Sequence, residues 1–154
     1  MSDTMTQDQA TGAPGTLDLQ IGIVAPADAP RPDLNGLRIK AIGEHQPVYL
    51  ILEGTRRLIP NLSTYDNLFI DRNGIYTAID LHLIPEGAPV SNGAVLAFAE
   101  PRPAEEAGGP VVLVTNEMQW FVGTMAKRYH LDLKKARSVP GVIMASVASG
   151  PSLK

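Results

Sequence analysis

The chain has 154 residues, a formal net charge of −3 and a hydrophobic content of 44%, which suits a globular protein with a core of its own. It contains no cysteine, so disulfide scaffolds, thiol catalysis and cysteine-based zinc sites are excluded. A slightly acidic chain lacks the dense basic patch that nucleic-acid binding requires, and we expect no nucleic-acid partner.

No stretch approaches the roughly 18 apolar residues of a membrane-spanning helix, so no membrane span is expected. Residues 1–7 have neither the basic start nor the apolar run of a signal peptide. The expected location is cytoplasmic, or outside the cell after export without a conventional signal peptide.

The first predicted element is a flexible N-terminal arm, residues 1–34, with a short strand near 17–24. Apolar and polar residues alternate over 17–24, which is the period of a half-buried strand, and a Pro-rich, extended link follows. This strand either belongs to its own domain or docks on the sheet edge of a neighbouring subunit. A protein partner or a homo-oligomer formed through residues 17–24 is therefore expected.

The rest of the chain, 35–154, contains an internal repeat. The segment 47–90 aligns without a gap on the segment 110–153, and the matches are mainly apolar. Core positions persist between the copies and polar positions do not, which is typical of a scaffold. We expect one domain of two repeats, 35–91 and 92–154, because a single repeat is too small to be stable alone.

Each repeat contains a predicted β-hairpin. In the first, two β-rich runs flank the turn Glu53-Gly54, and in the second they flank Asn116-Glu117, where Asn tolerates a left-handed conformation. Both faces of each hairpin are mostly apolar, so both faces are expected to be covered. The opening turns of the repeats, Asn35-Gly36 and Asn92-Gly93, lie closer together in the sequence than the two hairpins do, which predicts a six-residue insertion in the loop at 100–109.

After each hairpin the spacing of apolar residues changes from the period of a strand to that of a helix. Ser63 or Thr64 is expected to cap a short helix, and residues 125–131 are its predicted helical counterpart. A strand at 75–79 and a last helical turn or strand complete the first repeat. The predicted fold class is α+β, mainly β, with two tandem β-hairpin/short-helix repeats packed as one pseudo-twofold domain.

The first repeat resembles an uncharacterised bacterial tandem-repeat family. The family pattern is vYLI-x-x-G-x-x-R-x-IP-[NS], then TY and a closing IP-x-G, which residues 48–61, Thr64-Tyr65 and 84–87 match. The second repeat departs from it, with Glu117 in place of Gly54 and Trp120 in place of Arg57. The resemblance implies a non-catalytic binding or assembly module and brings no active site.

Residues with catalytic or metal-binding potential are scattered. The three histidines, His45, His82 and His130, have no metal-ligand spacing, and neither a metal nor a cofactor is expected. Four carboxylates of the first repeat have no carboxylate partner in the second, and we interpret them as caps, turns and solvated charges: Asp66, Asp71, Asp80 and Glu86. We therefore expect a protein that is not an enzyme.

The best candidates for a ligand or interface site are aromatic, basic and amide side chains. They are Tyr49, Arg56, Arg57, Asn61, Tyr65 and Trp120. Arginine makes planar hydrogen-bonded contacts to carboxylates and sugars, and tryptophan stacks on sugar rings or anchors interfaces. The alternative is structural, with Trp120 in the core and the Arg57 guanidinium on a carbonyl of its own repeat.

The predicted function is a non-enzymatic binding or assembly module that mediates protein–protein contacts, as part of a larger bacterial complex. A lectin-like glycan-binding module is the alternative, resting on the tryptophan, tyrosines and arginines. A small enzyme of unknown class is the third hypothesis.

Overall fold

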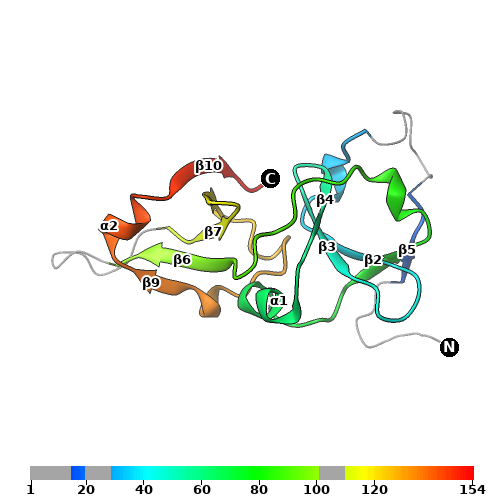
Figure 1. Ribbon diagram of the computed structural model, residues 1–154, viewed down its shortest axis with the longest axis horizontal. Helices are drawn as coiled ribbons and strands as arrows, with labels where there is room; N and C mark the ends of the chain where they lie inside the picture. The colour runs from blue at the N-terminus through cyan, green and yellow to red at the C-terminus, as the bar shows by residue number, and fades with distance from the viewer. Residues whose placement is uncertain (1–14, 20–28, 101–109) are drawn as a thin grey trace. The chain divides into compact units, whose positions relative to one another are not determined.

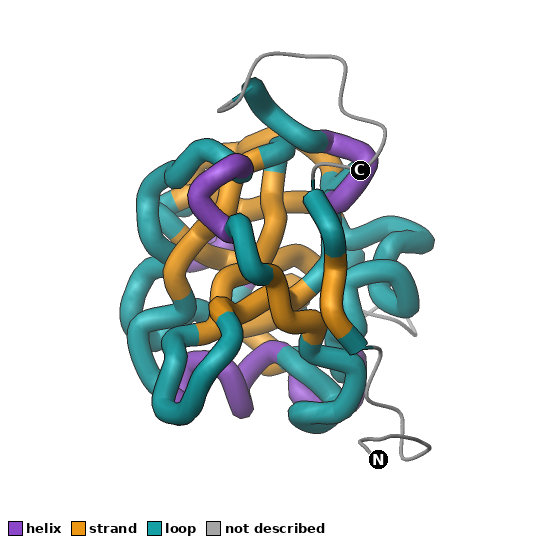
Figure 2. The backbone as a smooth tube through the Cα atoms, turned by 90° about the vertical axis from the view of Figure 1, so that its right-hand side faces the viewer, coloured by secondary structure: helices purple, strands orange, loops and turns teal. Residues whose placement is uncertain are grey.

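The computed structural model describes residues 15–19, 29–100 and 110–154. Strands and loops dominate these ranges and the helices are short (Figure 2). The strands form two mixed five-stranded sheets, which confirms the α+β, mainly β class. Within the described ranges, no helix is long and apolar enough to cross a membrane.

The chain divides into two compact units. Unit 1 holds the described residues up to Ile59 together with Asp71–Pro89, and unit 2 holds Pro60–Ile70 and Val90–Lys154. The predicted boundary between the repeats, at 91/92, differs from this division. Residues 60–70 follow the first hairpin in the sequence, yet they pack with the second unit.

The sheet of unit 1 has the order β1-β5-β2-β3-β4 (Figure 1). Its strands are β1 Thr16–Leu17, β2 Arg38–Ala41, β3 Val48–Leu52, β4 Thr55–Leu58 and β5 Tyr76–Ala78. The three strands β2, β3 and β4 form an antiparallel meander, and β5 runs parallel to both β1 and β2. Two short 3-10 helices, η1 Pro32–Leu34 and η2 Leu81–Leu83, complete the described part of the unit.

The sheet of unit 2 has the order β10-β8-β7-β6-β9. Its strands are β6 Val95–Ala99, β7 Val112–Thr115, β8 Met118–Phe121, β9 Arg137–Val139 and β10 Ala148–Ser152. The strands β6, β7 and β8 again form an antiparallel meander, β9 runs parallel to β6, and β10 runs parallel to β8. The helices of the unit are α1 Leu62–Leu68, η3 Leu133–Lys135 and α2 Gly141–Met144.

The two hairpins have matching registers when 47–90 is aligned on 110–153. The corresponding pairs are Tyr49–Leu58 and Val112–Phe121, Leu50–Arg57 and Leu113–Trp120, Ile51–Arg56 and Val114–Gln119, and Leu52–Thr55 and Thr115–Met118. The parallel bridge of Arg56 to Glu86 also has its counterpart in this alignment, Gln119 with Ser149. The predicted hairpins are thus present in both repeats.

The strand before each hairpin shows where the inserted residues lie. Arg38 lies opposite Leu50 in unit 1, and Leu96 lies opposite Leu113, the equivalent of Leu50, in unit 2. Arg38 is the second residue after the opening turn Asn35-Gly36, whereas Leu96 is the third residue after the opening turn Asn92-Gly93. One of the six inserted residues therefore lies between the second opening turn and β6, and the prediction that all six lie in the loop at 100–109 is wrong by that residue.

The N-terminal strand is shorter than predicted in its described part. Thr16 and Leu17 pair with β5, in the register Thr16–Thr77 and Leu17–Ala78, and the chain turns at Leu19. Residues 20–24 of the expected strand lie outside the described residues. The Pro-rich link also departs from an extended form at Pro32, where η1 begins, because proline fits the first turn of a helix.

Two predictions about helices are wrong. The cap of α1 is Asn61, whose side-chain oxygen accepts from the Thr64 amide at 2.9 Å, and not Ser63 or Thr64. Within 125–131, residues 126–130 form turns instead of a helix, and Leu131 forms an antiparallel bridge with Phe69. His130 has a φ of 57°, and this left-handed residue ends the turn after the Tyr129 amide has bonded to the Met125 carbonyl.

The core of unit 1 is aliphatic and is built from its own residues. Its buried members are Leu19, Ile39, Ile51, Ala78, Leu81 and Ile84. Leu50, Ile51 and Leu52 are all buried although their side chains alternate between the faces of the sheet. Both faces of β3 are therefore covered, as the apolar pattern predicts.

Candidate functional site

The six candidate residues are divided between the two units. Tyr49, Arg56 and Arg57 belong to unit 1, and Asn61, Tyr65 and Trp120 belong to unit 2.

Arg56 is held inside unit 1 by three contacts. Its Nε donates to the Ile84 carbonyl at 2.9 Å, and its Nη1 lies 3.6 Å from Glu86 Oε1. The guanidinium also lies over the Tyr49 ring, 5.2 Å from its centroid, in a cation–π contact. These contacts connect β4 to the residues that follow η2, so the arginine and the tyrosine serve the packing of the unit.

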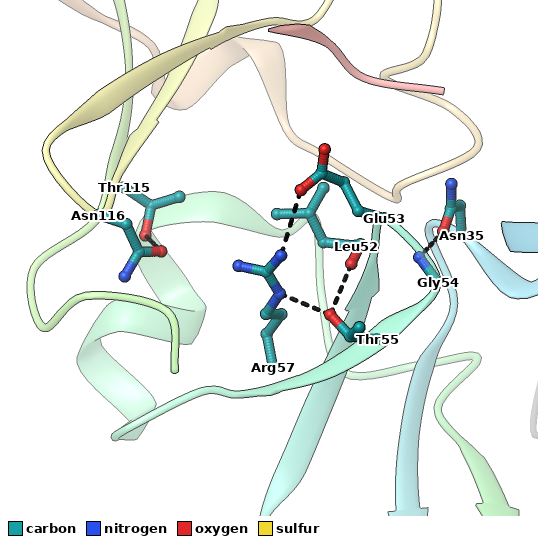
Figure 3. Close-up of polar contacts among 8 residues, drawn as sticks. All are labelled: Asn35, Leu52, Glu53, Gly54, Thr55, Arg57, Thr115 and Asn116. Carbon is teal, nitrogen blue, oxygen red and sulfur yellow. Dashed lines mark hydrogen bonds and ion pairs between the residues drawn. The ribbon is translucent and has the colours of Figure 1, made fainter. Parts of the chain in front are cut away.

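Arg57 packs across the closing glycine of the first repeat (Figure 3). Its Nε donates to Thr55 Oγ1 at 2.8 Å, and its Nη2 donates to Glu53 Oε1 at 3.3 Å. A Cβ atom on Gly87 would lie 2.7 Å from Arg57 Nε, so only glycine leaves room for this side chain. The guanidinium rests on a hydroxyl and a carboxylate, whereas the structural alternative from the sequence placed it on a carbonyl.

The hairpin turn beside Arg57 is also held in place from the N-terminal side (Figure 3). Glu53 and Gly54 have φ values of 53° and 75°, the left-handed pair of a tight hairpin turn. The Gly54 amide donates to the buried Asn35 Oδ1 at 2.7 Å, and its carbonyl accepts from the Arg31 amide at 2.9 Å. The Arg31 guanidinium donates hydrogen bonds to the Asp33 carboxylate, which raises the pKa of Arg31 and keeps it charged at neutral pH.

The second hairpin turn keeps this geometry without glycine. Asn116 and Glu117 have φ values of 56° and 61°. Ser91 holds the turn, because its amide donates to Thr115 Oγ1 at 2.9 Å and its hydroxyl accepts from the Asn116 amide at 3.0 Å. The predicted tolerance of Asn for the left-handed conformation is confirmed.

Asn61 and Tyr65 build the helix α1 and its attachment to unit 2. Asn61 Nδ2 donates to Asn92 Oδ1 at 2.9 Å, and the Gly93 amide donates to Thr64 Oγ1 at 2.9 Å. The Tyr65 ring is 3% exposed and packs on Phe69 with 4.6 Å between the centroids. The first turn of α1 thus fixes the turn that opens the second repeat.

Trp120 is buried in unit 2. Its side chain is 4% exposed, and its Nε1 has no hydrogen-bond partner among the described residues. A buried indole N–H usually finds an acceptor, so its absence is a local cost. A ring in this position cannot stack on a ligand without a rearrangement of the unit.

The metal-binding candidates do not gather. Among the described residues, no group of three or more His, Asp or Glu side chains could hold a metal ion. The His45 and Glu44 side chains are both 94% exposed and lie 4.0 Å apart. Asp71 stabilises a turn by accepting from the Asn73 amide at 2.9 Å, as its interpretation as a turn residue predicts.

The sequence prediction missed a pocket next to β1 and β5 that combines carboxyl groups with apolar side chains. It has a volume of about 260 Å³ and is lined by Thr16, Leu17, Asp18, Ile79 and Asp80. Asp80 is 8% exposed, and its Oδ1 has no hydrogen-bond partner within the described part of the chain. Of the expected roles as cap, turn or solvated charge, the turn remains, because the Asp80 carbonyl accepts from the Leu83 amide at 2.9 Å, whereas its side chain is buried and makes no capping bond. An aspartate after a short strand is an ordinary turn signal, so no local pattern could have identified it.

Unit 1 thus holds two internally bonded arginines and a pocket beside a carboxyl oxygen that has no partner among the described residues, and unit 2 holds an aromatic pair and a buried tryptophan. Comparison of the chain with protein-family models, with curated proteins and with solved structures gives no match.

Proposed function

We propose that the protein is a non-enzymatic binding or assembly module that mediates protein–protein contacts through an exposed edge of unit 2. The observation that carries the proposal is the position of β9 at the edge of its sheet, followed directly by α2. Val142 and Ile143 on α2 are 80% and 54% exposed. Edge strands offer unpaired N–H and C=O groups to another chain, and neighbouring exposed apolar side chains favour contact.

The occupant that fits this edge is a second copy of the chain. Identical edge strands can pair about a twofold axis, the commonest symmetry of oligomers. Two cations, one in β9 and one just before it, are engaged within their own unit. Lys135 Nζ donates to the Asp66 and Phe69 carbonyls, and Arg137 Nη2 donates to Asn67 Oδ1 at 3.2 Å. These contacts hold both side chains against unit 2, so they leave the β9 edge accessible to a second copy.

The internal contacts of the candidate residues support a structural role for them. Arg56 and Arg57 are engaged with their own repeat, as expected for a scaffold. Three expectations from the sequence stay predictions. They are the pseudo-twofold packing of two repeats in one domain, the resemblance to a bacterial tandem-repeat family, and an interface formed through residues 17–24.

Light scattering coupled to size exclusion tests the proposal. The native chain is expected to have a mass that rises from monomer to dimer with concentration, and Val142→Asp is expected to shift it toward the monomer. Leu62→Asp is the matched control, because Leu62 is also exposed (61%) but lies in the first turn of α1, where an acidic residue is tolerated. A native chain that stays monomeric throughout contradicts self-association through this edge.

The lectin-like alternative has less geometric support. The rings of Trp120 and Tyr65 are buried, and the Tyr49 ring lies under Arg56. A glycan array probed with the same preparation separates the two functions. Specific binding of one sugar by a monomer would favour the lectin-like module.

A further inference from the structure

Asp80 offers an unsatisfied acceptor in unit 1. Its exposed fraction is 8%, so it is more than nine-tenths buried, and its Oδ1 has no partner among the described residues. It occupies the position before η2, yet its side chain makes no capping bond to that helix. Buried oxygen atoms almost always accept a hydrogen bond, so this one is an open position for a donor from beyond the described residues.

The pocket next to Asp80 has a definite chemical character. Asp18 and Asp80 contribute two carboxyl groups, Thr16 contributes a hydroxyl, and Leu17 and Ile79 contribute apolar surface. The parallel pairing of β1 with β5 brings these residues together. Two carboxyl groups disfavour an anionic ligand, and the apolar side chains favour one that carries methylene groups.

We propose that this pocket binds an alkylammonium group, from a lysine side chain of a protein partner or from a free amine. An ammonium group has three donors and no acceptor, which suits an unsatisfied carboxyl oxygen beside a second carboxyl group. The methylene stem lies along Leu17 and Ile79 while the charge meets Asp80. The proposal is independent of the unit 2 edge, so each can fail without the other.

A divalent cation fits this pocket less well. Calcium takes six to eight oxygen ligands, and magnesium requires near-ideal octahedral geometry. Among the described residues no cluster of three or more potential side-chain ligands exists. Leu17 and Ile79 would also remain without a role.

NMR titration of the full-length ¹⁵N-labelled chain tests the proposal. The two ligands are n-butylammonium and Nα-acetyl-lysine amide, whose ε-ammonium group is free, and 1-butanol is the neutral control. We expect saturable shifts at the amides of Leu17 and Ile79 with both amines and none with butanol. Asp80→Asn keeps the shape of the side chain and is expected to weaken binding at least about ten-fold. Glu44→Gln removes an exposed carboxylate of the same unit and is expected to leave the affinity unchanged.

A second variant keeps the test decisive if Asp80→Asn loses its fold. Ile79 is 78% exposed, so Ile79→Lys leaves the core intact and places a competing ammonium group at the pocket. It is expected to weaken amine binding several-fold. Tighter binding of Nα-acetyl-lysine amide than of n-butylammonium supports a lysine of a partner, and the reverse order supports a free amine. The proposal is overturned if neither amine gives saturable shifts, if Asp80→Asn and Ile79→Lys both bind as the native chain does, or if calcium binds and the amines do not.

Discussion

Single residues of this chain act mainly through the backbone geometry they permit. Gly54 and Gly74 both lie in unit 1 with left-handed φ values of 75° and 81°, but their surroundings differ. A Cβ on Gly54 would lie 2.8 Å from the Arg31 backbone nitrogen, whereas one on Gly74 would meet only the end of the Arg38 side chain. The crossing of residues 30–32 over the hairpin turn therefore requires glycine at 54 for space as well as for conformation.

Gly54→Ala is expected to lower the free energy of unfolding by about 2–4 kcal/mol, since left-handed strain adds to a collision with backbone. Gly74→Ala introduces the left-handed strain without the collision with backbone, so it is the control. It is expected to lower the free energy of unfolding by about 1–2 kcal/mol. Urea denaturation followed through the amide signals of unit 1 measures both. Equal losses would mean that the segment at 30–32 does not lie against the turn.

Among the elements, α1 shows how a short helix is fixed by its ends. Asn61 caps its first turn and bonds to Asn92, while the Leu68 carbonyl at its other end accepts from the Asp132 amide at 2.9 Å. A helix of seven residues is not stable by propensity alone, so these end contacts and its buried face hold it.

Asn61→Ala is expected to destabilise unit 2 by about 1–2 kcal/mol, because it removes the cap and the bond to Asn92. Ser63→Ala is the matched control, since the Ser63 hydroxyl is exposed and donates to Asn61 Oδ1 at 2.9 Å without capping the helix. Its expected cost is below about 0.5 kcal/mol. Denaturation monitored by the fluorescence of Trp120 compares the two, and equal costs would contradict the capping role of Asn61.

At the scale of the whole molecule, two units each have buried residues of their own, and the chain passes from unit 1 to unit 2 and back before entering unit 2 again. Trp120 is the single tryptophan and lies buried in unit 2, so its fluorescence reports on that unit. Leu68 and Ile51 are both fully buried, the first in α1 of unit 2 and the second in the core of unit 1.

Leu68→Ala and Ile51→Ala are each expected to lower the free energy of unfolding by about 2–5 kcal/mol, because each leaves a cavity in a packed core. Leu68→Ala is expected to lower the urea midpoint of the Trp120 signal, because α1 packs in unit 2 although it follows the first hairpin. Ile51→Ala is expected to lower the urea midpoint measured from the amide signals of unit 1. It is expected to lower the midpoint of the Trp120 fluorescence less than Leu68→Ala does. A larger effect of Ile51→Ala on Trp120 would contradict the assignment of residues 60–70 to unit 2.

The sequence by itself determined the mainly β class, both hairpins with their turns, and the two covered faces of β3. These features depend on short-range causes, namely alternation of apolar residues and the left-handed preference of Gly and Asn. The tertiary structure alone decided that α1 packs with the second unit, that Arg57 rests on Thr55 and Glu53, and that Trp120 and Asp80 are buried. Burial and hydrogen-bond partners depend on contacts between segments far apart in the chain, and no local pattern encodes which segments meet.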